Sequence, residues 1–180
     1  MSDSYLGRLV DYDTWANAGL LQFLESQGPA VLGLRAAGVY GTIGETFEHL
    51  LLSEVSYHRN LLALPKVEYP QPETPTFDSL RALGIVAKGK LRGLVEGLPE
   101  PERMMHLGDG DRAAATIFTQ LVMHGVEHRA HIGTILGANG IIGLELDSWA
   151  HGIFAHGDAW PENWGPEPAE RLEFPSVDQR

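Results

Sequence analysis

The stretch TIFTQLVMHGVEHRAHIGTIL, residues 116–136, decides the fold that we predict for this chain. On a helix, one set of its positions recurs at spacings of 4, 3, 4, 3 and 4 residues, which is typical of the seam of a helix packed in a bundle. The positions of this seam are Ile117, Leu121, His124, His128, His131 and Ile135. Half of them are histidines, so the stretch predicts a bundle helix that presents imidazoles to the interior.

The spacing of these histidines leaves two pairs of metal ligands open. His124 and His128 are one helical turn apart, so their rings can point at one ion, and His128 and His131 also share a face. Zinc, nickel, iron and manganese all accept neutral imidazole, and three histidine ligands leave a position for water or substrate. The third ligand must come from another helix, and His49 is the candidate by position. The alternative is a hydrogen-bonded polar core, although burying three unpaired imidazoles is costly.

Apolar periodicity, with breaks at glycine and proline, predicts three further bundle helices and a short fifth helix. We expect them over about 4–26, 42–64 and 77–98, and the fifth within 144–155, while the last bundle helix begins at about Ala113 and stops at Gly137 to Gly140. Residues 104–107 form either a short strand or extended chain. These elements predict one all-α domain over 1–180, with a bundle over about 4–137 and a C-terminal extension over about 141–180 that ends in an irregular tail.

Local signals fix some of these boundaries but not the direction of His49. Thr42 and Glu45 fit a capping box at the start of the second helix, and Asp111 is a candidate cap for the last bundle helix. Ser2 or Asp3 is a candidate cap for the first helix. The second helix carries three consecutive leucines and is apolar on several sides. Periodicity therefore does not show which way His49 points.

The composition excludes several classes of function. A net charge of -11 makes nucleic acid and anionic membranes poor partners, because the chain shows no basic surface that would displace counterions. The chain has no cysteine, which rules out disulfides, thiolate zinc sites and a cysteine nucleophile. We find no signal peptide and no long apolar run, and expect a cytoplasmic protein. A metal would be held by histidine, carboxylates or water.

Three segments of the chain carry a resemblance to a known family. The first, LVDYDTWANAGLLQFL over 9–24, resembles the first helix of the DinB/YfiT-like superfamily. The second, FEHLLLSEVSYHRNLL over 47–62, resembles the helix that holds the family's first histidine, and the third, MHGVEHRAHIGTIL over 123–136, is similar to its H-x-x-x-H-R-G-Q motif. The resemblance covers roughly residues 5–137. After Arg129 the sequence departs from the motif, with Ala130 and His131 in place of glycine and glutamine.

This resemblance implies an up-down-down-up four-helix bundle, commonly dimeric, with His49, His124 and His128 as ligands of a divalent metal. Zinc or nickel is expected first, with iron or manganese as alternatives. Relatives of known activity include mycothiol-dependent maleylpyruvate isomerase and transferases of bacillithiol and other small thiols. The implied activity is metal-dependent activation of a low-molecular-weight thiol for transfer to, or isomerisation of, an electrophilic small molecule. A homodimer acting on a small-molecule substrate is therefore expected.

Few other residues are candidates for the chemistry. His131 and Glu45 are the catalytic candidates, and Glu54 and Asp109 are candidate partners for the N–H groups of the ligand imidazoles. Glu127 is next to a ligand but lies on a different helix face from His124 and His128. Tyr12 and Trp15 are expected in the pocket wall or in the core. We expect surface positions or local hydrogen bonds for the remaining histidines, which are His58, His106, His151 and His156. The alternative to an enzyme is a stress-response protein that binds metal or ligand without turnover.

Overall fold

The computed structural model describes residues 4–69 and 72–159. Its helices are α1 (Tyr5–Gln27), α2 (Ile43–Leu61), α3 (Phe77–Leu91), α4 (Ala114–Ala138) and α5 (Ser148–His156), with two short 3-10 helices, η1 (Pro29–Gly33) and η2 (Leu94–Gly97). A hairpin of β1 (Met104–Leu107) and β2 (Gly110–Ala113) precedes α4. Among the described residues, no helix combines the length and apolar character needed to cross a membrane.

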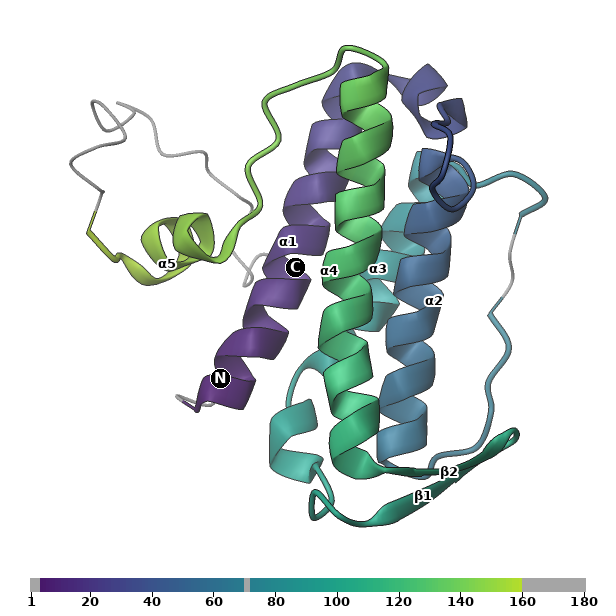
Figure 1. The fold of residues 1–180 in the computed structure, drawn as a ribbon, viewed down its shortest axis with the longest axis vertical. Coiled ribbons are helices and arrows are strands. Elements are labelled where there is room, and N and C mark those ends of the chain that lie inside the picture. The colour runs from purple at the N-terminus through teal and green to yellow at the C-terminus, as the bar shows by residue number, and fades with distance from the viewer. Residues whose placement is uncertain (1–3, 70–71, 160–180) are drawn as a thin grey trace.

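The four long helices form the expected up-down-down-up bundle (Figure 1). α1 runs up, α2 and α3 both run down, and α4 runs up again, because the segment between Leu61 and Phe77 returns the chain to the top. α2 packs most extensively on α4 and α3, and α1 packs against α3 and α4. The two helices that carry His49, His124 and His128 are therefore neighbours in the bundle.

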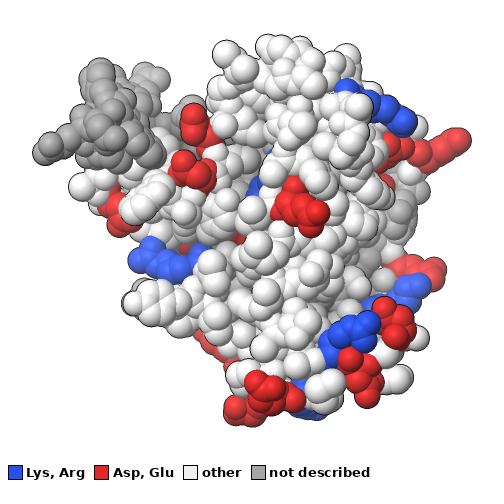
Figure 2. Space-filling model, in the orientation of Figure 1, with Lys and Arg blue, Asp and Glu red and all other residues white. Residues whose placement is uncertain are grey.

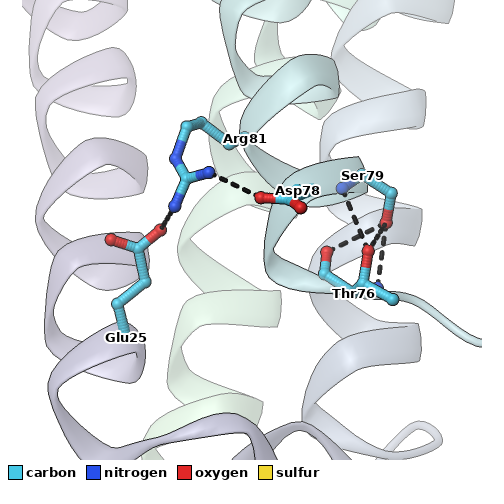
Figure 3. Close-up of polar contacts among 5 residues, drawn as sticks. All are labelled: Glu25, Thr76, Asp78, Ser79 and Arg81. Atoms are coloured by element: carbon cyan, nitrogen blue, oxygen red, sulfur yellow. Dashed lines mark hydrogen bonds and ion pairs between the residues drawn. The ribbon is translucent and has the colours of Figure 1, made fainter.

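The helix starts follow side-chain capping. At α2 the predicted capping box is confirmed, since the Thr42 hydroxyl accepts a hydrogen bond from the Glu45 N–H and the Glu45 carboxylate accepts one from the Thr42 N–H. Ser4 caps α1, whereas the predicted caps Ser2 and Asp3 lie outside the described residues. At α3, Thr76 and Ser79 exchange the same hydrogen bonds, and Arg81 joins Asp78 to Glu25 of α1 (Figure 3). These contacts fasten the top of α3 to α1.

Two helices end earlier than predicted, and one predicted cap is wrong. α2 stops at Leu61, and Ala63 has a positive φ of 51°. α3 stops at Leu91, because Gly93 takes the left-handed conformation and redirects the chain into η2. Asp111 does not cap α4; it lies in β2, where its carboxylate is 2.7 Å from His106 Nδ1. Residues 104–107 are a strand.

The buried core has two apolar clusters with polar side chains at the level between them. Leu20, Leu24, Ile132 and Ile135 belong to the upper cluster, and Val10, Leu61, Ile117 and Leu121 belong to the lower one. Several inward positions of α1 and α4 between these clusters are polar, namely Asp13, Asn17, His128 and Arg129. A functional site at mid-height of the bundle follows from this division.

The surface carries mixed charge on the face shown in Figure 2. Acidic and basic side chains lie side by side at the lower right, over the hairpin, where Arg112 pairs with Asp109 at 3.7 Å.

Candidate metal centre

Three histidines from α2 and α4 meet at mid-height of the bundle. The ring centroids of His49 lie 5.2 Å from His124 and 5.0 Å from His128, and those of His124 and His128 are 4.2 Å apart. The Nε2 atoms of His124 and His128 are 3.0 Å apart, and each histidine has a ring nitrogen within 4.8 Å of those of the other two. These three residues could hold one metal ion between them.

The local geometry explains how the sequence brings these rings together. His124 and His128 are separated by one helical turn on the inward face of α4, so both rings project toward α2. His49 lies on the face of α2 that packs against α4. The apolar periodicity of α2 had left this direction open. The outward neighbour Glu48 points to the cavity beside it, while Leu50 and Leu51 are fully buried in the core.

The imidazoles of this cluster are held in the neutral form, which is the form that binds a metal. Burial lowers the pKa of His124 to about 4, with His49 adding charge repulsion. Burial and the neighbouring histidines lower the pKa of His128 to about 4 as well. Burial also lowers the pKa of His49. At neutral pH the nitrogen lone pairs are therefore available to a cation without loss of a proton.

Aromatic rings and an open cavity border the cluster. Tyr40 lies 4.9 Å from His49 and 5.7 Å from His128, and Tyr57 lies edge-on to His124 at 5.6 Å. A cavity of about 390 Å³ opens beside His49 and is lined by Tyr40, Gly41, Glu45, Glu48, His49 and Leu52. A small molecule can therefore reach one side of the cluster.

The donor set fits a divalent transition ion. Three neutral imidazoles match the ligand preference of zinc, nickel and iron, and they leave coordination positions free. The Nδ1 atom of His128 is buried and has no hydrogen-bond partner in the structure. None of the carboxylates predicted to receive an imidazole N–H makes a hydrogen bond to the three histidines in the described chain.

A buried ionic network lies next to the cluster and explains the arginine that follows His128. Arg129 Nη2 lies 2.6 Å from Asp13 Oδ1, and Arg129 Nη1 donates to Asn17 Oδ1 at 2.7 Å. Asn17 in turn donates to Glu54 Oε1 at 2.6 Å. Burial, followed by the charge of Asp13, raises the pKa of Glu54 well above its usual range. The network joins α1, α2 and α4 around the level of the histidines.

Gly125 makes this network possible. A Cβ at this position would collide with the Asp13 carboxylate, which sits directly against the α4 backbone. This close approach was not predictable from the sequence, and Asp13 and Asn17 were not predicted as functional neighbours. One sequence feature could have indicated them: Asp13 and Asn17 are polar residues one helical turn apart, among the apolar positions that α1 buries.

The helper residues proposed from the sequence occupy different places. Glu45 is an exposed cap at the start of α2 and pairs with Arg35 at 3.4 Å, although it also lines the cavity. Glu54 belongs to the buried network, Asp109 lies at the hairpin turn, and Glu127 is exposed. His131 is half-buried with its ring 5.4 Å from His128, and the three-residue ligand group does not include it.

The other histidines are distributed over the molecule. His106 is exposed, as expected. His58 is buried and lines a second cavity of about 540 Å³ near Lys90, apart from the cluster. His151 is also buried, and its Nε2 lies 3.3 Å from that of His156, which agrees with the expected local contact. Both histidines lie against Asp11 of α1.

The comparison with solved structures identifies the fold. The chain is similar to the crystal structure of a DinB-like protein from Bacillus subtilis, with a TM-score of 0.59 and 14% sequence identity, over 76% of this chain and 95% of that one. No protein-family model matches the sequence, and a search of curated proteins found no match. The structural likeness confirms the DinB-like fold that the three sequence segments predicted.

Proposed function

We propose that this DinB-like protein binds one divalent transition ion through His49, His124 and His128 and uses it to activate a low-molecular-weight thiol. The thiol would be transferred to an electrophilic small molecule, or would assist its isomerisation. One observation carries the proposal: three neutral imidazoles converge beside an open cavity, and the group contains no fourth protein ligand among the described residues.

The chemistry needs both an ion and an external sulfur. A divalent ion bound by the imidazoles lowers the pKa of a coordinated thiol, so that thiolate is present at neutral pH. The chain has no cysteine, and the sulfur would therefore come from a cosubstrate. The three imidazoles hold the ion, and Tyr40 and Leu52 offer the apolar part of the cavity wall to the substrate. Glu48, whose pKa is raised by burial, is a candidate proton acceptor at the same wall.

The competing function is metal or ligand binding without turnover. In this alternative the same three histidines bind the ion. The coordination positions that they leave free would hold water or a ligand, and no reaction would take place there. The cavity beside His49 favours the enzyme, because a storage or structural site is usually closed by four protein ligands.

The first experiment measures the metal content of purified untagged protein by elemental analysis, before and after dialysis against chelator. We expect bound transition metal that the His124→Ala/His128→Ala variant loses in large part, and His106→Ala serves as the matched control outside the cluster. Protein reloaded with zinc or nickel is then mixed with small thiols and an aryl halide or a maleate-type electrophile, and thiol loss is followed. Metal-dependent thiol loss supports the transferase, and metal-dependent conversion of the maleate-type compound to its fumarate isomer without thiol loss supports the isomerase. Bound metal with no turnover in any combination favours the binder.

We also propose that the protein acts as a homodimer. Four apolar side chains on the neighbouring helices α1 and α4 are exposed to solvent: Leu6 at 42%, Leu9 at 41%, Met123 at 58% and Val126 at 39%. A second copy would bury them. Light scattering should give twice the chain mass for the wild type and one chain mass for a Leu9→Lys/Met123→Lys variant. A monomeric wild type at micromolar concentration would contradict the dimer.

A further inference from the structure

A second group of metal-type donors lies where α5 meets α1, about a half-turn around α1 from the buried network. α5 is nine residues long, and an isolated helix of this length is marginal in water. It is capped by Asp147, whose side chain accepts a hydrogen bond from the Ala150 N–H. The segment before it is held by Tyr12, whose hydroxyl donates to the Leu146 carbonyl at 2.8 Å. α5 therefore sits at the side of α1 (Figure 1).

Three donor atoms at this junction form a small triangle. Asp11 Oδ2 lies 3.0 Å from His156 Nε2 and 3.4 Å from His151 Nε2. The two Nε2 atoms are 3.3 Å from each other. The Nε2 atoms of the two imidazoles therefore lie close to the same carboxylate oxygen and close to each other.

The three donor–donor distances match those between neighbouring ligand atoms around a metal ion. Ligand bonds of about 2.1 Å to zinc or iron place neighbouring donor atoms about 3.0 Å apart at octahedral angles and about 3.4 Å apart at tetrahedral angles. The three observed separations fall within this range. Two N–H groups that donate to Asp11 account for two of the edges, but this arrangement brings two donor nitrogens within 3.3 Å of each other. A single ion satisfies all three edges.

The surroundings favour a bound ion over three solvated side chains. The side chains of His151, Asp11 and His156 are only 6%, 15% and 17% exposed. His151 packs between Tyr12 at 5.8 Å and Trp15 at 5.3 Å, which fixes the orientation of its ring. The positive charge of Arg8 acts on His156 and works against a cation, whereas the Asp11 carboxylate works for one. The three donors carry one negative charge, on the Asp11 carboxylate, and this charge would offset half of the charge of a divalent ion.

We propose that Asp11, His151 and His156 form a second metal site, which takes a divalent first-row transition ion such as Zn²⁺ or Fe²⁺ and fastens α5 to α1. Two imidazoles and one carboxylate that occupy one face of the ion leave its remaining positions to water or a small ligand. The site is separate from the three-histidine centre, and its existence does not depend on the function proposed for that centre.

The test is zinc titration of the full-length, chelator-treated protein, with stoichiometry measured by calorimetry and by competition with a chromogenic chelator. The wild type should bind two ions per chain. The His124→Ala/His128→Ala variant should keep the α1–α5 ion, and an Asp11→Ala/His156→Ala variant should keep the three-histidine ion. His106→Ala is the matched control, because His106 and Asp111 form an exposed histidine–carboxylate pair at 2.7 Å without a third donor.

Cobalt gives a readout that a purely structural role of these side chains would not produce. Co²⁺ bound by two imidazoles and a carboxylate shows d–d absorption that differs in position and intensity from that of aqueous Co²⁺. This difference should remain in His124→Ala/His128→Ala and disappear when Asp11 and His156 are also replaced. Affinity at the α1–α5 site should fall about 100-fold for His156→Ala and stay within about threefold for His106→Ala.

Two results would overturn the second site and leave the first one intact. One is a wild type that binds a single zinc ion which the His124→Ala/His128→Ala variant loses. The other is a second ion whose affinity does not change in Asp11→Ala/His156→Ala. A wild type whose single ion is lost only in Asp11→Ala/His156→Ala would instead support the α1–α5 site and contradict the three-histidine centre.

Discussion

The two donor clusters of this molecule both contain imidazoles but stand in different frameworks, and only the second includes a carboxylate. The three-histidine centre joins two long helices, α2 and α4, at the level where the bundle core becomes polar. The Asp11–His151–His156 cluster joins α1 to a nine-residue helix outside the bundle. The helices of the first cluster pack extensively on each other, whereas α5 makes few contacts with α1. Packing alone therefore positions the ligands of the three-histidine centre, while under our proposal a bound ion would help to position α5.

α1 displays this contrast within three residues. Asp11 and Asp13 point to opposite sides of the helix, because two residues turn an α-helix by about 200°. Asp13 is fully buried against Arg129 beside the three-histidine centre, and Asp11 faces α5. Tyr12 lies between them, with the Arg129 guanidinium 5.4 Å from its ring and the His151 ring 5.8 Å away. Tyr12 therefore contacts both the buried network around Arg129 and the α1–α5 cluster.

Replacing these two aspartates gives the largest expected difference. Asp13→Ala leaves the buried Arg129 charge unpaired and should lower the free energy of unfolding by about 3–5 kcal/mol. Asp11→Ala affects a more exposed group and should lower it by about 1 kcal/mol. Urea unfolding of both metal-free variants measures the difference. Equal losses would mean that the network around Arg129 does not support the bundle as described.

Removing ligands from one cluster should leave metal binding by the other unchanged. His128→Ala should weaken zinc binding at the three-histidine centre by about 100-fold or more, while zinc at the α1–α5 cluster stays within about threefold. His151→Ala should show the reverse pattern. Competition titration against a chromogenic chelator gives both affinities. If one substitution weakens both ions equally, the two clusters act as a single unit through Tyr12.

The fold was largely predictable, and the two clusters were predictable to different degrees. The 4, 3, 4, 3, 4 spacing identified α4 and its inward histidines, because a bundle helix repeats its buried face at that period. The direction of His49 needed the structure, since three adjacent leucines make α2 apolar on several sides. The α1–α5 cluster gave no sequence signal. Its histidines are five residues apart on a short helix, and its aspartate lies 140 residues before His151. Such a meeting depends on tertiary packing alone.

As the pH falls, the first loss of stability in the metal-free protein should come from protonation of the histidines in the three-histidine centre. The folded-state pKa values of His124 and His128 are lowered from 6.5 to about 4, mainly by burial, so the unfolded chain binds more protons over this range. Their contribution to stability is present above pH 6.5 and is lost as the pH falls toward 4. A hydrogen bond from His151 lowers the pKa of Asp11, so Asp11 contributes stability that is lost separately as the pH falls below 3.8.

Urea unfolding midpoints measured between pH 7 and 4 test this order. A His124→Gln/His128→Gln variant should show a flatter decline than the wild type, and His49 and His156, whose pKa values burial also lowers, should account for part of what remains. An unchanged slope in the double variant would show that these imidazoles titrate normally in the folded protein.

The smallest effect is expected for Glu45, the acidic candidate at the cavity. Glu45→Gln removes its charge and keeps a side chain that can complete the capping box with Thr42, so the free energy of unfolding should change by less than about 0.5 kcal/mol. Zinc affinity at the three-histidine centre should not change. A strong loss of metal-dependent thiol consumption with normal stability and zinc binding would instead give Glu45 a role in the chemistry.

Anomalous diffraction at the zinc absorption edge, from crystals of the zinc-loaded protein, would locate the ion in the three-histidine centre. We expect a strong peak within about 2.1 Å of one ring nitrogen from each of His49, His124 and His128. A second peak is expected beside Asp11, His151 and His156. Zinc-loaded crystals with no peak at the three histidines, whatever else binds zinc, would contradict the proposed metal centre.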